Sequence, residues 1–139
     1  MNETATKAHF SFALLHAAQA VGDQLEAALN EIGLSMAKQS ALTKLAEAGE
    51  PLTLSDLAAR LSCVRSNITQ LVDRLEGDGL VRRVNDSTDR RSVRAELTAT
   101  GMEKQKAGAE AMIRVQEELS QKVSGTDLSA LESALDAFS

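Results

Sequence analysis

Arginine, the side chain best suited to phosphates, is concentrated in one window of this 139-residue chain. Eight of its nine arginines fall there, namely Arg60, Arg65, Arg74, Arg82, Arg83, Arg90, Arg91 and Arg94. The window 60–94 holds five acidic residues and no lysine, so its formal charge is +3. The whole chain carries −5, and the remainder therefore carries −8. Guanidinium groups pair with phosphate oxygens and with base edges, so the window predicts a nucleic acid interface within an otherwise acidic protein.

The segment 65–76 adds residue types that read DNA bases. Its apolar residues recur with helical spacing and would face a core: Ile68, Leu71, Val72 and Leu75. In a major groove, Asn and Gln pair with adenine and Arg with guanine, while Ser and Thr bind phosphates or either base. We predict DNA contacts from the polar side of this helix and from the strand after it, by Arg65, Ser66, Asn67, Thr69, Gln70, Arg74 and Arg83. Any amphipathic surface helix has a polar side, so the prediction also depends on the neighbouring elements.

Those neighbours form a recognisable order. A helix at 54–61, a break at 62–64 and the helix at 65–76 predict a helix-turn-helix. Two β-rich runs, 80–84 and 92–98, then enclose a polar segment and predict a hairpin with a basic tip.

The hairpin tip supplies a second set of expected DNA contacts. An arginine on a narrow turn can enter the minor groove, where negative potential is concentrated. Asp89 precedes Arg91 by two positions, so its carboxylate can hold the guanidinium in one orientation. Asp89, Arg90 and Arg91 therefore join the predicted contacts.

The rest of the chain is predicted to be helical. The apolar stripe at 7–32 is longer than one small core requires, so it predicts contact with a second chain. Ser35 and Gly49 would bound a helix at 36–48, and Thr98 would cap one at 99–122, before a last helix beginning near 128. We expect one domain over 1–139, mainly α with a small β-hairpin wing. A winged helix-turn-helix core at 34–101 would be flanked by dimerisation helices at 7–32 and 99–138.

Four segments carry a resemblance to a known family: LTLSDLAARL (52–61), SNITQLVDRLEGDGLVRRV (66–84), DSTDRRS (86–92) and ELTATG (96–101). They resemble the winged helix-turn-helix core of the MarR family. The resemblance implies a cytoplasmic homodimer that represses transcription at a pseudo-palindromic operator in double-stranded DNA and is released by a small-molecule effector. It implies that residues 66, 67, 69, 70 and 74 enter the major groove, that Arg91 reaches the minor groove, and that Arg90 lies near the backbone. Val64 departs from the serine that caps this helix in many members. The effector pocket would be lined by His9, Phe10, His16 and Met36.

Two other functions stay open. Cys63 could act as a redox sensor, because Arg65 and a helix N-terminus would favour its thiolate, although a small packed residue is the simpler interpretation. Alternatively, the fold could be a dimeric interaction module without specific DNA binding. No grouping of residues predicts an enzyme, a metal site or a cofactor. The stretch Phe10–Val21 is too short and too polar to supply the roughly 20 apolar residues of a membrane span.

Overall fold

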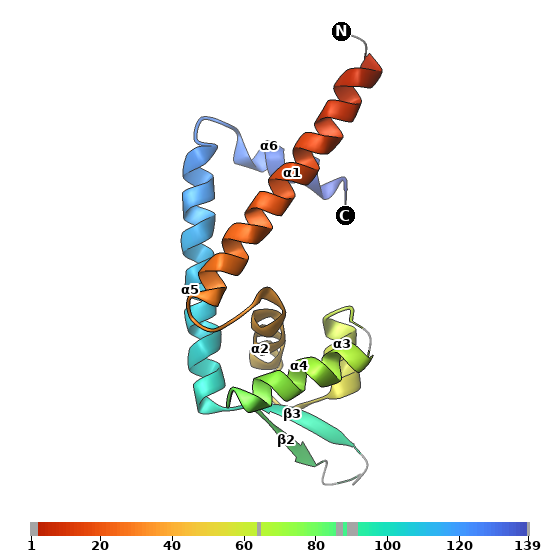
Figure 1. Cartoon of the computed structure of the whole chain (residues 1–139), viewed down its shortest axis with the longest axis vertical. Helices are drawn as coiled ribbons and strands as arrows, with labels where there is room; N and C mark the ends of the chain where they lie inside the picture. The colour runs from red at the N-terminus through yellow and green to blue at the C-terminus, as the bar shows by residue number, and fades with distance from the viewer. Residues whose placement is uncertain (1–2, 64, 86–87, 89–91, 139) are drawn as a thin grey trace.

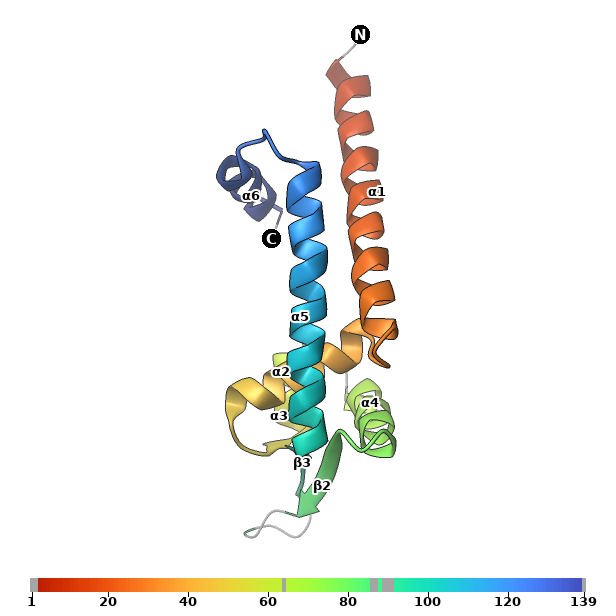
Figure 2. The ribbon, with the colours of Figure 1, turned by 90° about the vertical axis from the view of Figure 1, so that its left-hand side faces the viewer.

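Two long helices pack together near a smaller lobe and diverge from each other away from it (Figures 1 and 2). The computed structural model describes residues 3–63, 65–85, 88 and 92–138. Its elements are α1 (Glu3–Asn30), α2 (Met36–Ala48), β1 (Leu52–Thr53), α3 (Leu54–Arg60), α4 (Arg65–Gly77), β2 (Val81–Asn85), β3 (Val93–Leu97), α5 (Ala99–Lys122) and α6 (Leu128–Asp136). The long pair is α1 and α5, and the lobe contains α2 to α4 with the three strands.

The ends of the helices follow the local sequence signals. The Ser35 hydroxyl accepts a hydrogen bond from the Lys38 N–H at the start of α2, and Gly49, with a φ of 67°, ends that helix. Thr53 caps α3 in the same way, and Thr98 caps α5. The predictions that Ser35 and Gly49 bound α2 and that Thr98 caps α5, and those for the spans of both helices, are confirmed.

The hairpin belongs to a three-stranded antiparallel sheet in the order β1-β3-β2. The sequence predicts β2 and β3, and they pair with Val81 opposite Leu97. Leu52 and Thr53, directly before α3, also join the sheet as β1, because Leu52 pairs with Ala95. The hairpin is thereby fastened to the start of the helix-turn-helix.

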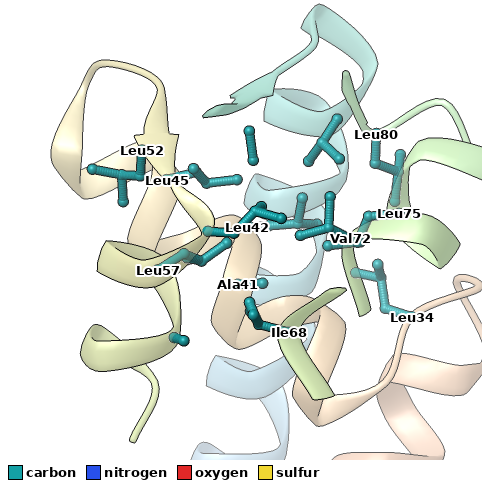
Figure 3. Packing of buried hydrophobic residues seen from close by; sticks show 14 of the residues in the cluster. Leu34, Ala41, Leu42, Leu45, Leu52, Leu57, Ile68, Val72, Leu75 and Leu80 are labelled. Atoms are coloured by element: carbon teal, nitrogen blue, oxygen red, sulfur yellow. The ribbon is translucent and has the colours of Figure 1, made fainter. Parts of the chain in front are cut away.

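One apolar core holds the lobe together (Figure 3). Leu42, Leu57, Ile68, Val72 and Leu75 are fully buried and come from α2, α3 and α4. Complete burial of such a side chain is worth about 1.5–3 kcal/mol, so this cluster fixes the three helices relative to one another.

The prediction for one residue of α4 needs correction. Leu71, expected to point inward with the others, is only partly buried. It lies at the border of the apolar face and lines a surface cavity with Cys63 and Asn67.

Small residues of α5 face the lobe. An ideal Cβ on Gly101 would lie 2.0 Å from the Leu80 carbonyl oxygen, and one on Gly108 would lie 2.1 Å from the Gln39 amide oxygen. The helical spacing of apolar residues in 99–122 predicts Met102 and Ile113 on the packed side of the helix, but both side chains are exposed. The close approach of the Leu80 backbone to Gly101 and of the Gln39 side chain to Gly108 therefore determines which face of α5 turns inward.

Far from the lobe, the helices expose aromatic and aliphatic side chains. Phe12 is 71% exposed and Phe138 is 64% exposed, and among its described residues α6 buries none. The rings of Phe10 and Phe138 have their centroids 6.4 Å apart, so α1 and α6 present a shared apolar surface.

Candidate nucleic-acid interface

The turn between α3 and α4 fixes the direction of the second helix. The Cys63 N–H donates to the Ala58 carbonyl at 3.0 Å, and the Ser62 N–H donates to the Ala59 carbonyl at 3.2 Å. Ser62 has a φ of 52°, a left-handed conformation that non-glycine residues adopt at some cost. The chain adopts this conformation in the turn, where it changes direction. The direction that results lets Ile68 and Val72 of α4 point into the core.

The outer face of α4 carries the residues predicted to read DNA. Ser66, Asn67, Thr69, Gln70 and Arg74 are all exposed, and they recur along one side of the helix opposite its buried residues. Arg65 begins α4, and its side chain lies outside the described residues. A surface of amide, hydroxyl and guanidinium groups can hydrogen-bond base edges and phosphates together.

The β2–β3 hairpin projects beside α4 at the foot of the lobe (Figure 1). Its tip carries the second set of predicted contacts, and Asp89, Arg90 and Arg91 lie outside the described residues, as does Val64. The pairing of Asp89 with Arg91 therefore stays a prediction. On β2, Arg82 is exposed and donates to Glu96 at 2.5 Å. This hydrogen bond is the main reason why the pKa of Arg82 lies above its ordinary value.

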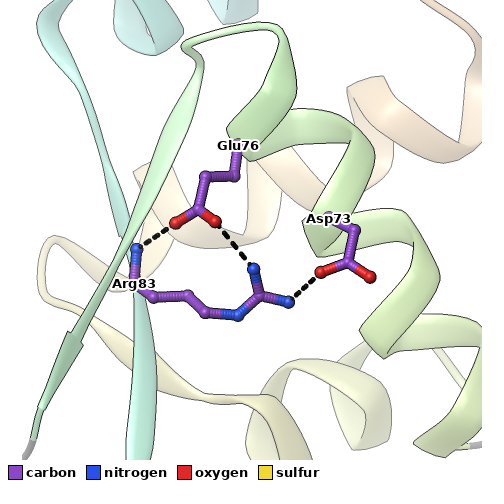
Figure 4. A network of polar contacts seen from close by, with 3 residues as sticks. All are labelled: Asp73, Glu76 and Arg83. Atoms are coloured by element: carbon purple, nitrogen blue, oxygen red, sulfur yellow. Dashed lines mark hydrogen bonds and ion pairs between the residues drawn. The ribbon is translucent and has the colours of Figure 1, made fainter.

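Arg83 behaves differently from its neighbour (Figure 4). Its Nη2 donates to Asp73, its Nη1 donates to Glu76 Oε1 at 2.8 Å, and its backbone N–H donates to Glu76 Oε2 at 2.9 Å. The hydrogen bond to Asp73 raises the pKa of Arg83, partial burial opposes this, and the bond to Glu76 adds to the rise. The sequence groups Arg83 with the DNA contacts, whereas the structure directs its guanidinium at two carboxylates of α4.

A second ion pair holds the end of α4 from another side. Lys38 Nζ on α2 lies 2.7 Å from Asp78 Oδ2, directly after the helix. The local sequence pattern does not identify the partners in these ion pairs between elements. It does place Asp73 and Glu76, three positions apart, on the same side of α4, where one arginine of a strand could bridge them.

Cys63 is partly buried in the turn and has interactions there. It borders a cavity of about 370 Å³ with Asn67, Gln70, Leu71 and Arg74, next to the outer face of α4. The redox-sensor alternative stays a hypothesis, because this position is compatible with a packed thiol as well.

The four residues expected to line an effector pocket do not share a cavity within the described chain. His9 and Phe10 are exposed on the first turns of α1, and His16 borders a hollow formed by α1 alone. Met36 instead lines a cavity of about 390 Å³ between α2 and α5. The helical spacing places residues on one face, but it does not indicate how far α1 extends beyond the lobe.

The cavity between α2 and α5 contains a residue that the sequence analysis missed. Gln39 is only 4% exposed, and its Nε2 donates to the Gln105 carbonyl at 2.9 Å. Its Oε1 is buried and has no hydrogen-bond partner among the described residues. The same cavity is lined by Thr43, Met112 and Ile113. Gln39 is flanked by the polar residues Lys38 and Ser40, so the sequence gives no local signal that it is buried.

The described parts of the chain also bear on metal binding and on membrane insertion. No group of three or more His, Cys, Asp or Glu residues there is arranged to hold a metal ion. No helix there combines the length and the apolar character needed to cross a bilayer.

A helix-turn-helix with an exposed polar second helix, followed by a β-hairpin, defines a winged helix-turn-helix protein. Residues 34–93 of the chain match the model of the MarR family, so the chain is similar to that family in its helix-turn-helix lobe. It is 33% identical over 94 residues to the HTH-type transcriptional regulator FarR of Neisseria gonorrhoeae, covering 68% of this chain and 64% of the relative. The curated relatives are matched over less than two thirds of their own length.

Solved structures agree over almost the whole chain. The MarR family transcriptional regulator AbsC of Streptomyces coelicolor is 28% identical, with a TM-score of 0.78 over 99% of this chain and 93% of that one. The transcriptional repressor CouR, bound to a 23-mer DNA duplex, has a TM-score of 0.82 at 24% identity, over 99% and 97% of the two chains. The likeness to CouR concerns the fold.

Proposed function

We propose that this chain is a sequence-specific regulator of transcription that binds double-stranded DNA and has no enzymatic activity. The observation that carries the proposal is the exposed polar face of α4, with Asn67, Gln70 and Arg74 beside the wing. The chain is similar in fold to CouR, whose structure contains a DNA duplex, and this supports the same use of the lobe. In this role α4 enters the major groove, and Arg91, oriented by Asp89, reaches the minor groove with Arg90 near the backbone.

The active form is a homodimer. The exposed apolar side chains of α1 and α6, including Phe10, Phe12, Leu135 and Phe138, need a cover that one chain does not supply. A two-fold dimer would bring two copies of α4 to half-sites about one DNA turn apart, so its operator would be pseudo-palindromic. Such a protein would act in the cytoplasm, where the DNA is.

Selection from random duplex DNA tests this function. The purified protein is incubated with the library, and bound fragments are sequenced after several rounds. We expect enrichment of an inverted repeat with half-site centres about 10 bp apart. Absence of any enriched sequence would favour the dimeric interaction module, in which a protein partner covers the basic window.

We further propose that the regulator is a repressor released by a small-molecule effector. The cavity between α2 and α5 supports this role, because it joins a helix of the lobe to a helix of the dimer. A ligand wedged beside Met36 and Met112 would move the lobe relative to α5, and the spacing of the two copies of α4 would change. By linkage, an effector that weakens DNA binding must itself bind less tightly to the DNA complex.

A cavity-filling variant tests the effector site. Ala109 lines the cavity from α5, and Ala109→Met would occupy part of it. We expect the variant to bind the operator but to lose the response to compounds that release the wild-type protein. An unchanged response would place the effector elsewhere.

A promoter fusion tests the sign of regulation. A fusion that becomes more active on deletion of the regulator would support repression, and one that becomes less active would exclude it.

A further inference from the structure

The contact between β2 and α4 is made by one residue with both its side chain and its backbone. Arg83 donates two guanidinium hydrogen bonds, one to Asp73 and one to Glu76, and its backbone N–H binds the second oxygen of Glu76. β2 is an edge strand, with β3 on one side only. Glu76 therefore satisfies a backbone donor that no neighbouring strand reaches.

The two carboxylates lie one turn apart on the last part of α4. The apolar contacts of Ile68 and Val72 keep the helix on the core, but burial of apolar area is not directional. A planar guanidinium held between two carboxylates is directional, because its N–H groups have a fixed fork geometry. The network therefore restricts how α4 rolls and tilts relative to the strand that leads to the wing (Figure 4).

The adjacent arginine shows what such a link requires. Arg82 also pairs with a carboxylate, but its partner Glu96 belongs to β3 of the same hairpin, and its side chain is 67% exposed. The Arg83 side chain is 27% exposed and joins two different elements. Arg82 is thus a matched control: an equal charge at the next position, without a connection to α4.

We propose that Arg83 is a positioning residue that sets the angle between α4 and the wing and thereby determines operator recognition, rather than a residue that contacts DNA. The proposal rests on the DNA-binding function proposed above. The effect of Arg83 on stability is small because both carboxylate partners are exposed, and ion pairs with exposed partners contribute little to folding.

The first experiment measures the angle without DNA. Residual dipolar couplings of backbone amides in α4 and β2 are recorded for the wild type, Arg83→Met, the double variant Asp73→Ala/Glu76→Ala, and Arg82→Met as the control. For the wild type and Arg82→Met, we expect the couplings of α4 and β2 to fit the relative orientation of the two elements in the structure. For Arg83→Met and the double variant, we expect them not to fit it. The wild-type orientation of α4 relative to β2 in Arg83→Met would overturn the proposal. Thermal midpoints within about 5 °C of the wild type would show that the variants remain folded.

The second experiment measures affinity for the selected operator at several salt concentrations. Arg83→Met should bind about tenfold more weakly, the scale of coupling through a positioning contact, with an unchanged dependence on salt. Arg83→Lys should not restore binding, because a lysine cannot hold both carboxylates in a fixed geometry. Asp73→Ala/Glu76→Ala should also bind more weakly, although it removes two negative charges near DNA.

A direct contact of Arg83 with phosphate predicts the opposite pattern. The salt slope of Arg83→Met would fall by about one unit per protomer, Arg83→Lys would retain most of the affinity, and removal of the two acids would tighten binding. That pattern would overturn the proposal while leaving the function intact. Failure of the wild-type protein to prefer any DNA would refute the proposed function, and the couplings would still decide whether Arg83 sets the angle.

Discussion

The amide of Gln39 lies so close to Gly108 that α5 has no room for a side chain at that position. An ideal Cβ there would be 2.1 Å from Gln39 Oε1 and 2.4 Å from its Cδ. Gln39 is itself held by the hydrogen bond to the Gln105 carbonyl. The glutamine and the glycine together determine how closely α2 of the lobe approaches the long helix α5.

Gly108→Ala should therefore destabilise the protein in the presence of Gln39. Overpacking a buried site costs about 1–3 kcal/mol, and displacing the glutamine loses a hydrogen bond worth roughly 1 kcal/mol. The gain of about 1 kcal/mol in helix propensity offsets part of this. We expect a net decrease of about 1–3 kcal/mol in the free energy of unfolding, measured by urea denaturation at one fixed protein concentration.

A control in a Gln39→Ala background should reverse the sign of the effect of Gly108→Ala on the free energy of unfolding. In a Gln39→Ala background the obstacle is gone, so the same Gly108→Ala change should be neutral or stabilising by up to about 1 kcal/mol. Gly22→Ala, in α1 with no atom within 4 Å of the added carbon, should also stabilise. Equal destabilisation by Gly108→Ala in both backgrounds would show that the amide is not the obstacle.

The apolar surface of α1 and α6 predicts the oligomeric state. Wild-type protein should sediment at about twice the 14.8 kDa of one chain across the micromolar range. Phe12→Glu places a charge on that surface and should shift the distribution toward monomer, because a buried unpaired charge is costly. The matched control Ala59→Glu adds the same charge to the exposed side of α3 and should leave the mass unchanged. A wild-type mass near that of one chain would contradict the dimer.

Local sequence signals predicted most of this fold, and contacts between distant segments account for the differences. Ser35, Gly49 and Thr98 act within a few residues, so the ends of α2 and the start of α5 could be placed from the sequence. The pairing of β1 with β3 joins residues more than 40 positions apart, and no local pattern encodes it.

In the candidate site, too, local sequence signals predict some features and contacts between distant segments determine the others. The outer face of α4 follows from helical periodicity, and the structure exposes every predicted residue whose side chain it describes. Arg83 could not be separated from Arg82 by residue type, because only the geometry of the hairpin brings one of them to Asp73. The burial of Gln39 likewise depends on the glycine that meets it from α5.

Cys63 provides a test between the simple repressor and the redox sensor. If the thiol is a packing residue, Cys63→Ser should keep the operator affinity of the wild type, and dilute peroxide should change neither protein. Affinity is measured by fluorescence anisotropy before and after treatment. Loss of binding in oxidised wild type, restored by a thiol reductant and absent in the variant, would establish the sensor.

Gln70 should affect specificity without affecting salt dependence. Its uncharged amide lies on the exposed face of α4, so Gln70→Ala removes a base contact but no phosphate-neutralising charge. We expect a loss of about 1–3 kcal/mol for the best operator and weaker discrimination at one base pair of each half-site. Binding to a panel of single-base operator variants measures both. A loss that is uniform across the panel would assign Gln70 to the backbone instead.

Asp89 gives the sharpest test of the wing, because two mechanisms predict opposite signs. A carboxylate near DNA repels phosphates, so simple electrostatics predicts that Asp89→Ala binds more tightly. If Asp89 instead orients Arg91, the variant loses the ordered guanidinium and binds more weakly, by up to the 1–3 kcal/mol of about one good contact.

Arg91→Ala should lose a similar amount and about one unit of salt slope per protomer. In the orienting mechanism, Asp89→Ala should then add little to Arg91→Ala, because the partner that it positions is already absent. Operator titrations of the two single variants and the double variant at three salt concentrations measure these quantities. Tighter binding by Asp89→Ala would refute the orienting role and leave Asp89 as a repulsive charge on the wing.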